Sequence, residues 1–183
     1  MATLTPARAV TLNALALGAV ALVLAAAFAA QLVLHELPCP LCLLQRIMFA
    51  LLAIGPILNI RFGPRPSHYA LSLLVAVAGA VVSTRQVLLH IMPGDPGYGT
   101  ALLGYHYYTW ALIGFVAAIV LIAVILLFDA QFAPAPAAGG VARMAVWLVI
   151  GLVALNVLST LLECGFAACA DNPAVYELLK RGP

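Results

Sequence analysis

Five apolar stretches, each about as long as a membrane-crossing helix, leave this sequence few ways to fold. A bilayer core about 30 Å thick requires about 20 apolar helical residues. Stretches of this kind occupy approximately residues 10–34, 42–60, 69–91, 107–128 and 144–163. Only 8% of the 183 residues are charged, too few to cover a soluble globule. The sequence therefore predicts an all-α polytopic membrane protein with five spans.

Basic residues in the short connecting segments predict how the chain is oriented. Arg8, Arg61, Arg65 and Arg143 fall on one side of the five spans, whereas Lys180 and Arg181 fall in the tail on the other. Because positive charges concentrate in cytoplasmic loops, we expect a cytoplasmic N-terminus and a C-terminus outside the cytoplasm. The first apolar stretch is longer than that of a signal peptide, so we expect it to be an uncleaved span. A net charge of +2 without a basic stripe argues against a nucleic-acid partner.

The connectors between the spans are short and rich in proline and glycine. Residues 35–39 and 61–67 form brief turns, residues 92–106 a longer loop, and residues 131–140 a flexible linker. With five spans, the turn at 35–39, the loop at 92–106 and the tail after residue 163 all emerge on the outer side. All four cysteines therefore fall on the same outer face.

The first cysteine pair, Cys39 and Cys42, lies in a C-x-x-C motif where the second span begins. Pro40 suits the first turn of a helix, where its missing N–H has no consequence. A cysteine at a helix N-terminus has a favoured thiolate, so this position predicts a reactive sulfur. A structural disulfide and half of a metal site are the alternatives. We interpret the motif as redox-active because of its proline, its apolar margin and a nearby arginine.

The second pair, Cys164 and Cys169, directly follows the fifth span, with Gly165 between the two cysteines. Alone, this spacing is equally compatible with a disulfide that staples the tail. Two close pairs on an oxidising face are, however, what a dithiol relay requires. Four thiolates could also bind zinc. The oxidising side and the lipid margin argue against zinc, so we predict no metal.

Three further residues near the outer ends of the spans are candidates for binding a cofactor. Arg46 lies one helical turn after Cys42, and a charge inside a span is costly and usually functional. Its guanidinium would stabilise a thiolate and donate to a quinone carbonyl, although it could also extend to the headgroups. Arg85 and His90 lie near the outer end of the third span. Arg85 is equally compatible with an interfacial and a functional position, and His90 is either an interface residue or a titratable ring that delivers protons to a quinone.

Residues 38–46, PCPLCLLQR, resemble the first outer-loop motif of the DsbB family, a C-x-x-C followed four residues later by arginine. Residues 85–93 and 107–128 are similar to the family's third and fourth helices, and the likeness covers about residues 8–130. The resemblance implies a four-helix bundle in a bacterial inner membrane. Such a protein reoxidises a periplasmic thioredoxin-like, DsbA-like dithiol protein and passes electrons to ubiquinone or menaquinone.

Carried over by position, the resemblance also implies residue roles. Cys39 would exchange with the second cysteine pair, Cys42 would contact the quinone, and Arg46 would belong to the quinone site. His90 matches the family's third-helix histidine only loosely. The family's second cysteine pair lies in the second outer loop, but the corresponding loop here, residues 92–106, contains no cysteine.

The fifth span and the tail cysteines are additional to the family pattern. We therefore expect residues 1–130 to form a DsbB-like four-helix core, and residues 131–183 a linker, a fifth transmembrane helix and a periplasmic tail whose pair replaces the missing one. Asp171-Asn172-Pro173 predicts a short helix in that tail, with an apolar stripe on the membrane surface. The alternatives are electron flow in the opposite direction and a non-catalytic membrane carrier or assembly subunit braced by two structural disulfides.

Overall fold

The five predicted spans all form helices, so the expected all-α membrane architecture is confirmed. The computed structural model describes residues 4–134 and 137–180. Its helices are α1 (Pro6–Val33), α2 (Pro40–Leu52), α3 (Ile54–Phe62), α4 (Pro66–Leu89), α5 (Tyr107–Leu126) and α6 (Gly140–Cys164). Helices α2 and α3 together make one span, Pro40–Phe62. Proline opens α1, α2 and α4, where its fixed φ suits the first turn.

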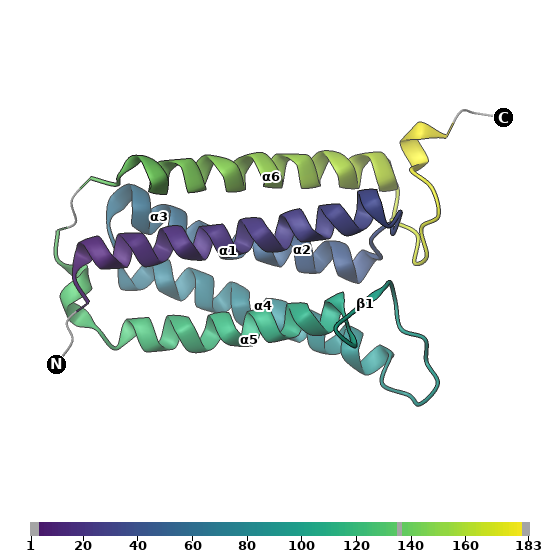
Figure 1. Ribbon diagram of the computed structural model, residues 1–183, viewed down its shortest axis with the longest axis horizontal. Helices are drawn as coiled ribbons and strands as arrows, with labels where there is room; N and C mark the ends of the chain where they lie inside the picture. The colour runs from purple at the N-terminus through teal and green to yellow at the C-terminus, as the bar shows by residue number, and fades with distance from the viewer. Residues whose placement is uncertain (1–3, 135–136, 181–183) are drawn as a thin grey trace.

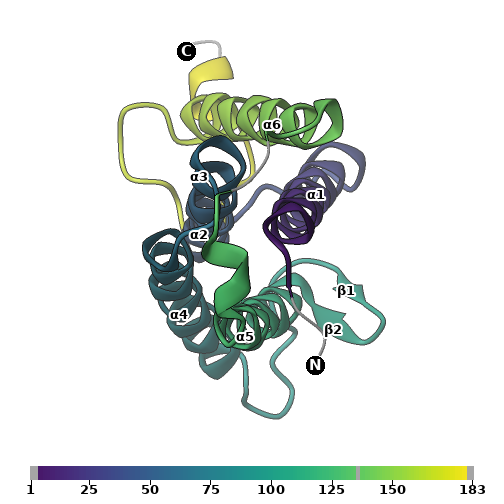
Figure 2. The same ribbon diagram turned by 90° about the vertical axis from the view of Figure 1, so that its left-hand side faces the viewer.

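The helices lie side by side along the long axis of the molecule (Figure 1). Helix α4 packs against α5 and α2, and α1 packs against α3 and α6. Viewed along the bundle, α6 covers the side formed by α1 and α3, away from α4 and α5 (Figure 2). The bundle centre contains buried Leu17, Leu24 and Phe115, and the Phe115 ring stacks on Phe49 with 4.1 Å between ring centroids.

The second span is broken between α2 and α3 at Ala53, a feature that the sequence analysis did not predict. Pro56 has no N–H to donate, which leaves the Leu52 carbonyl without its usual helical partner. The Ser72 hydroxyl of α4 donates to that carbonyl at 3.0 Å, so the break leaves this acceptor satisfied inside the bundle. Gly55 permits the close approach, because a Cβ there would overlap Ser72 Oγ and the His68 carbonyl.

A buried polar network joins four segments at the end of the bundle opposite the cysteines. Asn59 of α3 donates to Asn13 of α1, and Asn13 donates to the hydroxyl of Tyr69 at 2.9 Å. The Tyr69 hydroxyl donates to Gln131, whose amide donates to the carbonyls of residues 125 and 128. Gln131 belongs to the short 3-10 helix η1 (Asp129–Phe132) and is fully buried. The start of the predicted linker is therefore anchored rather than flexible.

The remaining elements lie mainly at the outer end. Strands β1 (Ala101–Leu102) and β2 (Tyr105–His106) pair as an antiparallel hairpin in the loop between α4 and α5. The helix predicted to follow Asp171 is wrong, since the tail up to residue 180, where the description ends, contains only the 3-10 turn η2 (Glu177–Leu179). Its Tyr176 is drawn into the bundle by a hydrogen bond with Gln31. Residues 135–136 of the predicted linker and Arg181 of the tail lie outside the described residues.

Replacing Gly55 tests how tightly the broken span is held against α4. Gly55→Ala should lower the free energy of unfolding by about 1–3 kcal/mol, because the added methyl meets the backbone of α4, which cannot move aside freely. Gly18→Ala is the matched control, since a Cβ at this other helical glycine meets nothing within 4 Å. Thermal unfolding in detergent, followed by circular dichroism, compares the two. Equal melting temperatures for both variants and the unaltered protein would contradict the packing described.

Candidate redox site

The Cys39–Cys42 pair forms a disulfide at the N-terminus of α2. Cys39 caps the helix, and its sulfur accepts a hydrogen bond from the Cys42 backbone N–H at 3.2 Å. Pro40 occupies the first helical position. Cys39 is 7% exposed, whereas Cys42 is only partly buried. The helix N-terminus carries partial positive charge, so this position favours the thiolates that appear when the disulfide is reduced.

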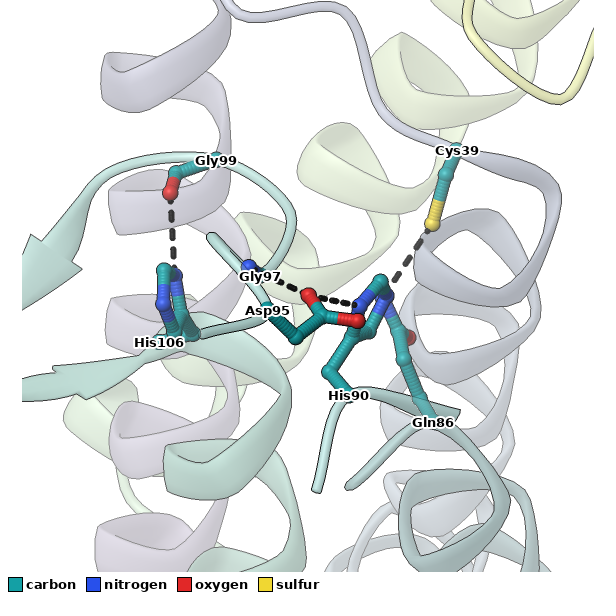
Figure 3. A network of polar contacts seen from close by, with 7 residues as sticks. All are labelled: Cys39, Gln86, His90, Asp95, Gly97, Gly99 and His106. Atoms are coloured by element: carbon teal, nitrogen blue, oxygen red, sulfur yellow. Dashed lines mark hydrogen bonds and ion pairs between the residues drawn. The ribbon is translucent and has the colours of Figure 1, made fainter. Parts of the chain in front are cut away.

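A glutamine from the third span contacts both sulfurs of this disulfide. Nε2 of Gln86 lies 3.3 Å from Cys39 Sγ and 3.4 Å from Cys42 Sγ (Figure 3 shows the first contact). Nε2 of Gln45 donates to Gln86 Oε1 at 2.9 Å, which fixes the orientation of the amide so that its N–H groups face the sulfurs. Both glutamines are buried. Two spans thus hold a hydrogen-bond donor against the redox pair.

Close to Gln86, His90 forms part of a polar group that shapes the outer loop (Figure 3). Its Nδ1 lies 2.9 Å from an oxygen of Asp95, which also accepts the backbone N–H of Gly97 at 2.7 Å. The Gly97 N–H and the His90 ring hold the pKa of the Asp95 carboxyl below its ordinary value. His90 also stacks on buried Tyr108, with 5.5 Å between ring centroids. These contacts give His90 a loop-ordering position.

The loop between α4 and α5 is tied to the segment immediately before Cys39. The Glu36 carboxylate accepts both the backbone N–H and the hydroxyl of Thr100. The Tyr98 hydroxyl donates to the Leu37 carbonyl at 2.7 Å. Burial raises the pKa of that hydroxyl, and the nearby carboxylates of Glu163 and Glu36 raise it further. The loop between α4 and α5, which contains no cysteine, is therefore fastened by hydrogen bonds to the segment that precedes the Cys39–Cys42 disulfide.

Arg46 points away from Gln86, toward α1 and α6. Its Nη1 donates to Gln31 Oε1 at 2.7 Å, and its Nη2 donates to the Ala27 carbonyl at 2.9 Å. The guanidinium carbon also lies 5.8 Å from the centre of the Phe28 ring. Arg46 is only partly buried, but its polar end bonds to protein rather than extending outward to the headgroups. It therefore forms part of a polar cluster between helices.

Helix α6 and the tail complete this cluster. Gln31 Nε2 donates to Ser159 Oγ of α6 at 2.8 Å and to Tyr176 Oη of the tail at 3.0 Å. One turn after Ser159, Glu163 is 2% exposed. Neither of its carboxylate oxygens has a hydrogen-bond partner within the described residues. Arg46 is the charged group whose field acts on that carboxyl.

The second cysteine pair forms its own disulfide, Cys164–Cys169, where α6 ends. Cys164 is buried, and Gly165 has φ +64°, a conformation that favours glycine and turns the chain out of the helix. Phe166, inside the disulfide loop, is 92% exposed. The C-terminal end of α6 and the N-terminal end of α2 lie at the same end of the bundle (Figure 1).

Sequence reasoning placed some site residues together and missed others. Cys42 lies about one turn of α2 from Arg46 and immediately follows the turn that Cys39 caps. Arg85 is exposed on the outer face of α4, in a groove with apolar neighbours, whereas the adjacent Gln86 faces the sulfurs. The residues that sequence reasoning missed are Gln31, Gln45, Gln86, Tyr98, Ser159, Glu163 and Tyr176. Most are polar side chains inside apolar spans, which is the signal that could have identified them.

Comparisons with known proteins converge on one family. The sequence model for "Disulfide bond formation protein DsbB" matches residues 8–100. The chain is 40% identical over 65 residues to Disulfide bond formation protein B 2 of Burkholderia lata, covering 35% of this chain and 39% of that protein. It is 40% identical over 77 residues to Disulfide bond formation protein B of Xanthomonas axonopodis pv. citri, covering 39% of this chain and 45% of that protein. It thus spans less than half the length of these curated relatives. No solved structure gives a significant match.

Removing the Gln86 amide should make the Cys39–Cys42 disulfide harder to reduce. A thiolate accepts a stronger hydrogen bond than a disulfide sulfur, so the donor stabilises the reduced form. Such a bond contributes about 1.5–3 kcal/mol, and about 1.4 kcal/mol corresponds to about 30 mV for this two-electron couple. We therefore expect Gln86→Leu to lower the reduction potential by about 30 mV or more.

Equilibration with glutathione buffers measures this potential, in a Cys164→Ser/Cys169→Ser background where only one pair titrates. Ser83→Ala is the control, because Ser83 is equally buried on α4 and its hydroxyl has no hydrogen-bond partner within the described residues. A potential unchanged by Gln86→Leu, or shifted equally by Ser83→Ala, would mean that the amide does not tune the sulfurs.

Proposed function

Because the chain belongs to the DsbB family, we propose that it is a membrane thiol–quinone oxidoreductase that generates disulfides. Its substrate on the donor side is a reduced periplasmic thioredoxin-like, DsbA-like dithiol protein. Its electron acceptor is ubiquinone or menaquinone in a bacterial inner membrane. The single observation that carries the proposal is the Cys39–Cys42 disulfide, capping a membrane helix and contacted at both sulfurs by a buried amide donor.

The chemistry follows from where the two cysteine pairs lie. A thiolate of the donor protein attacks the Cys164–Cys169 disulfide, and the donor's second thiolate releases its own disulfide from the mixed intermediate. The reduced tail pair then attacks Cys39–Cys42 in the same manner. Each exchange moves two electrons and leaves the attacked pair as a dithiol. The helix N-terminus and the Gln86 amide favour this outcome at Cys39–Cys42, because both stabilise a departing thiolate.

The residues beside Cys42 fit a quinone. Arg46, one turn below Cys42, offers a cationic donor, and the buried Glu163 carboxyl, which has no hydrogen-bond partner within the described residues, interacts with its charge. An apolar cleft of about 490 Å³ between α1 and α5 runs from Val23, one turn from the Ala27 carbonyl that accepts from Arg46, toward Asn13 and Tyr69 at the opposite end of the bundle. Such a cleft suits an isoprenoid chain entering from the lipid. A bound quinone would supply the oxidising power by accepting two electrons and two protons. Arg46 would hold its ring by hydrogen bonding and balance the charge that develops.

In this proposal residues 1–130 form the catalytic core, and residues 131–183 provide the donor-facing pair that the outer loop lacks. The five spans put the two chain ends on opposite sides of the membrane, and the arginine-rich connectors favour a cytoplasmic N-terminus. The tail pair then faces the periplasm. The exposed Phe166 between its two cysteines gives the thioredoxin-like protein an apolar contact next to the sulfurs.

The test is quinone reduction by the purified protein, supplied with either a reduced thioredoxin-like protein or dithiothreitol. The unaltered chain should oxidise both. Cys164→Ser/Cys169→Ser should abolish oxidation of the protein donor but largely preserve that of dithiothreitol, which reaches Cys39–Cys42 directly. Cys39→Ser/Cys42→Ser should abolish both.

The same assay separates the proposal from its rivals. If the unaltered chain reduces no quinone with either donor, its disulfides are structural and the protein is not an oxidase. If the tail variant oxidises the protein donor at the unaltered rate, Cys164–Cys169 is only a staple.

A further inference from the structure

Glu163 differs from every other acidic residue of the chain. The sequence contains six aspartates and glutamates, and Glu163 is the one that is buried, at 2% exposure. Glu36 bonds to Thr100, Asp95 to His90 and Gly97, and Glu177 to Lys180. The Glu163 carboxylate oxygens, by contrast, have no partner within residues 4–134 and 137–180. The spans of this chain contain few charged residues. In the last turn of α6, however, they include one buried carboxyl without a hydrogen-bond partner among the described residues.

Glu163 lies on the same face of α6 as Ser159, which is linked to Arg46 through Gln31. Ser159 precedes Glu163 by one helical turn, so both lie on one face of α6. Ser159 accepts from Gln31, and Gln31 accepts from Arg46. The charges of Arg46 and Glu163 act on each other, yet the described residues include no ion pair between them. The carboxyl is therefore close enough to Arg46 for their charges to interact, without forming an ion pair with it among the described residues.

This arrangement suits a carboxyl that binds and releases a proton. A buried carboxylate without a partner is costly, so the neutral acid is the stable form at rest. Arg46 lies near enough for its positive charge to lower the free-energy cost of burying the Glu163 carboxylate while that anion exists. Tyr98 of the outer loop and Tyr176 of the tail are the other titratable groups near Glu163 and Arg46. One direct ion pair would hold the carboxyl as a permanent anion, whereas this separation leaves both forms accessible.

We propose that Glu163 is the residue that holds and releases a proton at the quinone site. It lies on α6, the helix that this chain has in addition to the four of the family pattern. This rests on the proposed function. When the Cys39 and Cys42 thiols become a disulfide, they lose two electrons and two protons, and the quinone gains two of each to become quinol. With a quinone bound, Glu163 would give it one of these protons and the thiols would supply the other, while Arg46 would balance the resulting Glu163 carboxylate. A proton released by the thiols then restores the acid, so Glu163 is unchanged after each turnover.

Infrared spectroscopy tests the protonation without any quinone. The oxidised, full-length protein is placed at neutral pH in a detergent without ester groups. It should show a carboxylic-acid C=O band from Glu163, the one acidic side chain that is buried without a partner within the described residues. Glu163→Gln should remove that band, and Glu177→Gln, which alters the exposed tail carboxyl paired with Lys180, should keep it. A spectrum without the band in the unaltered protein, or a band that persists in Glu163→Gln, overturns the proposal.

Turnover with dithiothreitol and quinone tests whether the proton is used. Glu163→Gln keeps the shape of the side chain but cannot release a proton, and should lower kcat on the order of 100-fold. Glu163→Asp keeps the acid on a shorter stem and should retain most of the activity, as should Glu177→Gln. A structural role predicts the reverse, with Gln tolerated and Asp harmful, and that order would refute the proposal. If the unaltered protein reduces no quinone, the proposed function has failed, and the infrared band still decides whether Glu163 holds a proton.

Discussion

The bilayer offers no partner to a buried polar group, and this constraint organises the whole molecule. Buried polar side chains such as Asn13, Gln31 and Gln45 therefore bond to other helices and gather into interhelical clusters, and Glu163 is an exception among the described residues. The cluster at one end, around Asn13 and Tyr69, ties three spans and the start of a connector together. The clusters at the other end surround Cys39–Cys42, with Gln86 on one side and Arg46 on the other. The hydrogen bonds that position the helices relative to one another thus also position the groups around the Cys39–Cys42 disulfide.

The fifth helix changes what this second end can do. It packs on α1 (Figure 2), brings Ser159 and Glu163 to the group around Arg46, and ends at the Cys164–Cys169 disulfide. The loop that would hold a second pair in the family pattern is used differently. Its Tyr98 and Thr100 fasten it over the segment before Cys39. One added helix can therefore supply both the missing sulfurs and a titratable group.

The sequence was sufficient for the parts of this structure that depend on local pattern. Hydropathy and length located five spans, and C-x-x-C with a proline located the helix start at Cys39. The features that the sequence could not predict depend on which faces of the helices pack against each other. Gln86 lies beside Arg85 in the chain, yet only packing of α4 against α2 decides that the amide faces the sulfurs and the guanidinium faces outward. The predicted tail helix does not form. A short helix is only marginally stable by itself, and Tyr176 forms a hydrogen bond with Gln31 instead.

The central claim is that the two cysteine pairs, distant in sequence, exchange directly at one end of the bundle. Trapping the mixed disulfide tests this most directly. Cys42→Ser combined with Cys164→Ser or with Cys169→Ser leaves Cys39 and one tail cysteine, and the oxidised full-length protein is then digested and its linked peptides identified by mass spectrometry. We predict that at least one combination gives a disulfide between Cys39 and the tail cysteine within a single chain. If both combinations leave the two sulfurs unlinked, or link them only between chains, the tail pair does not serve Cys39–Cys42 and the relay described here is wrong.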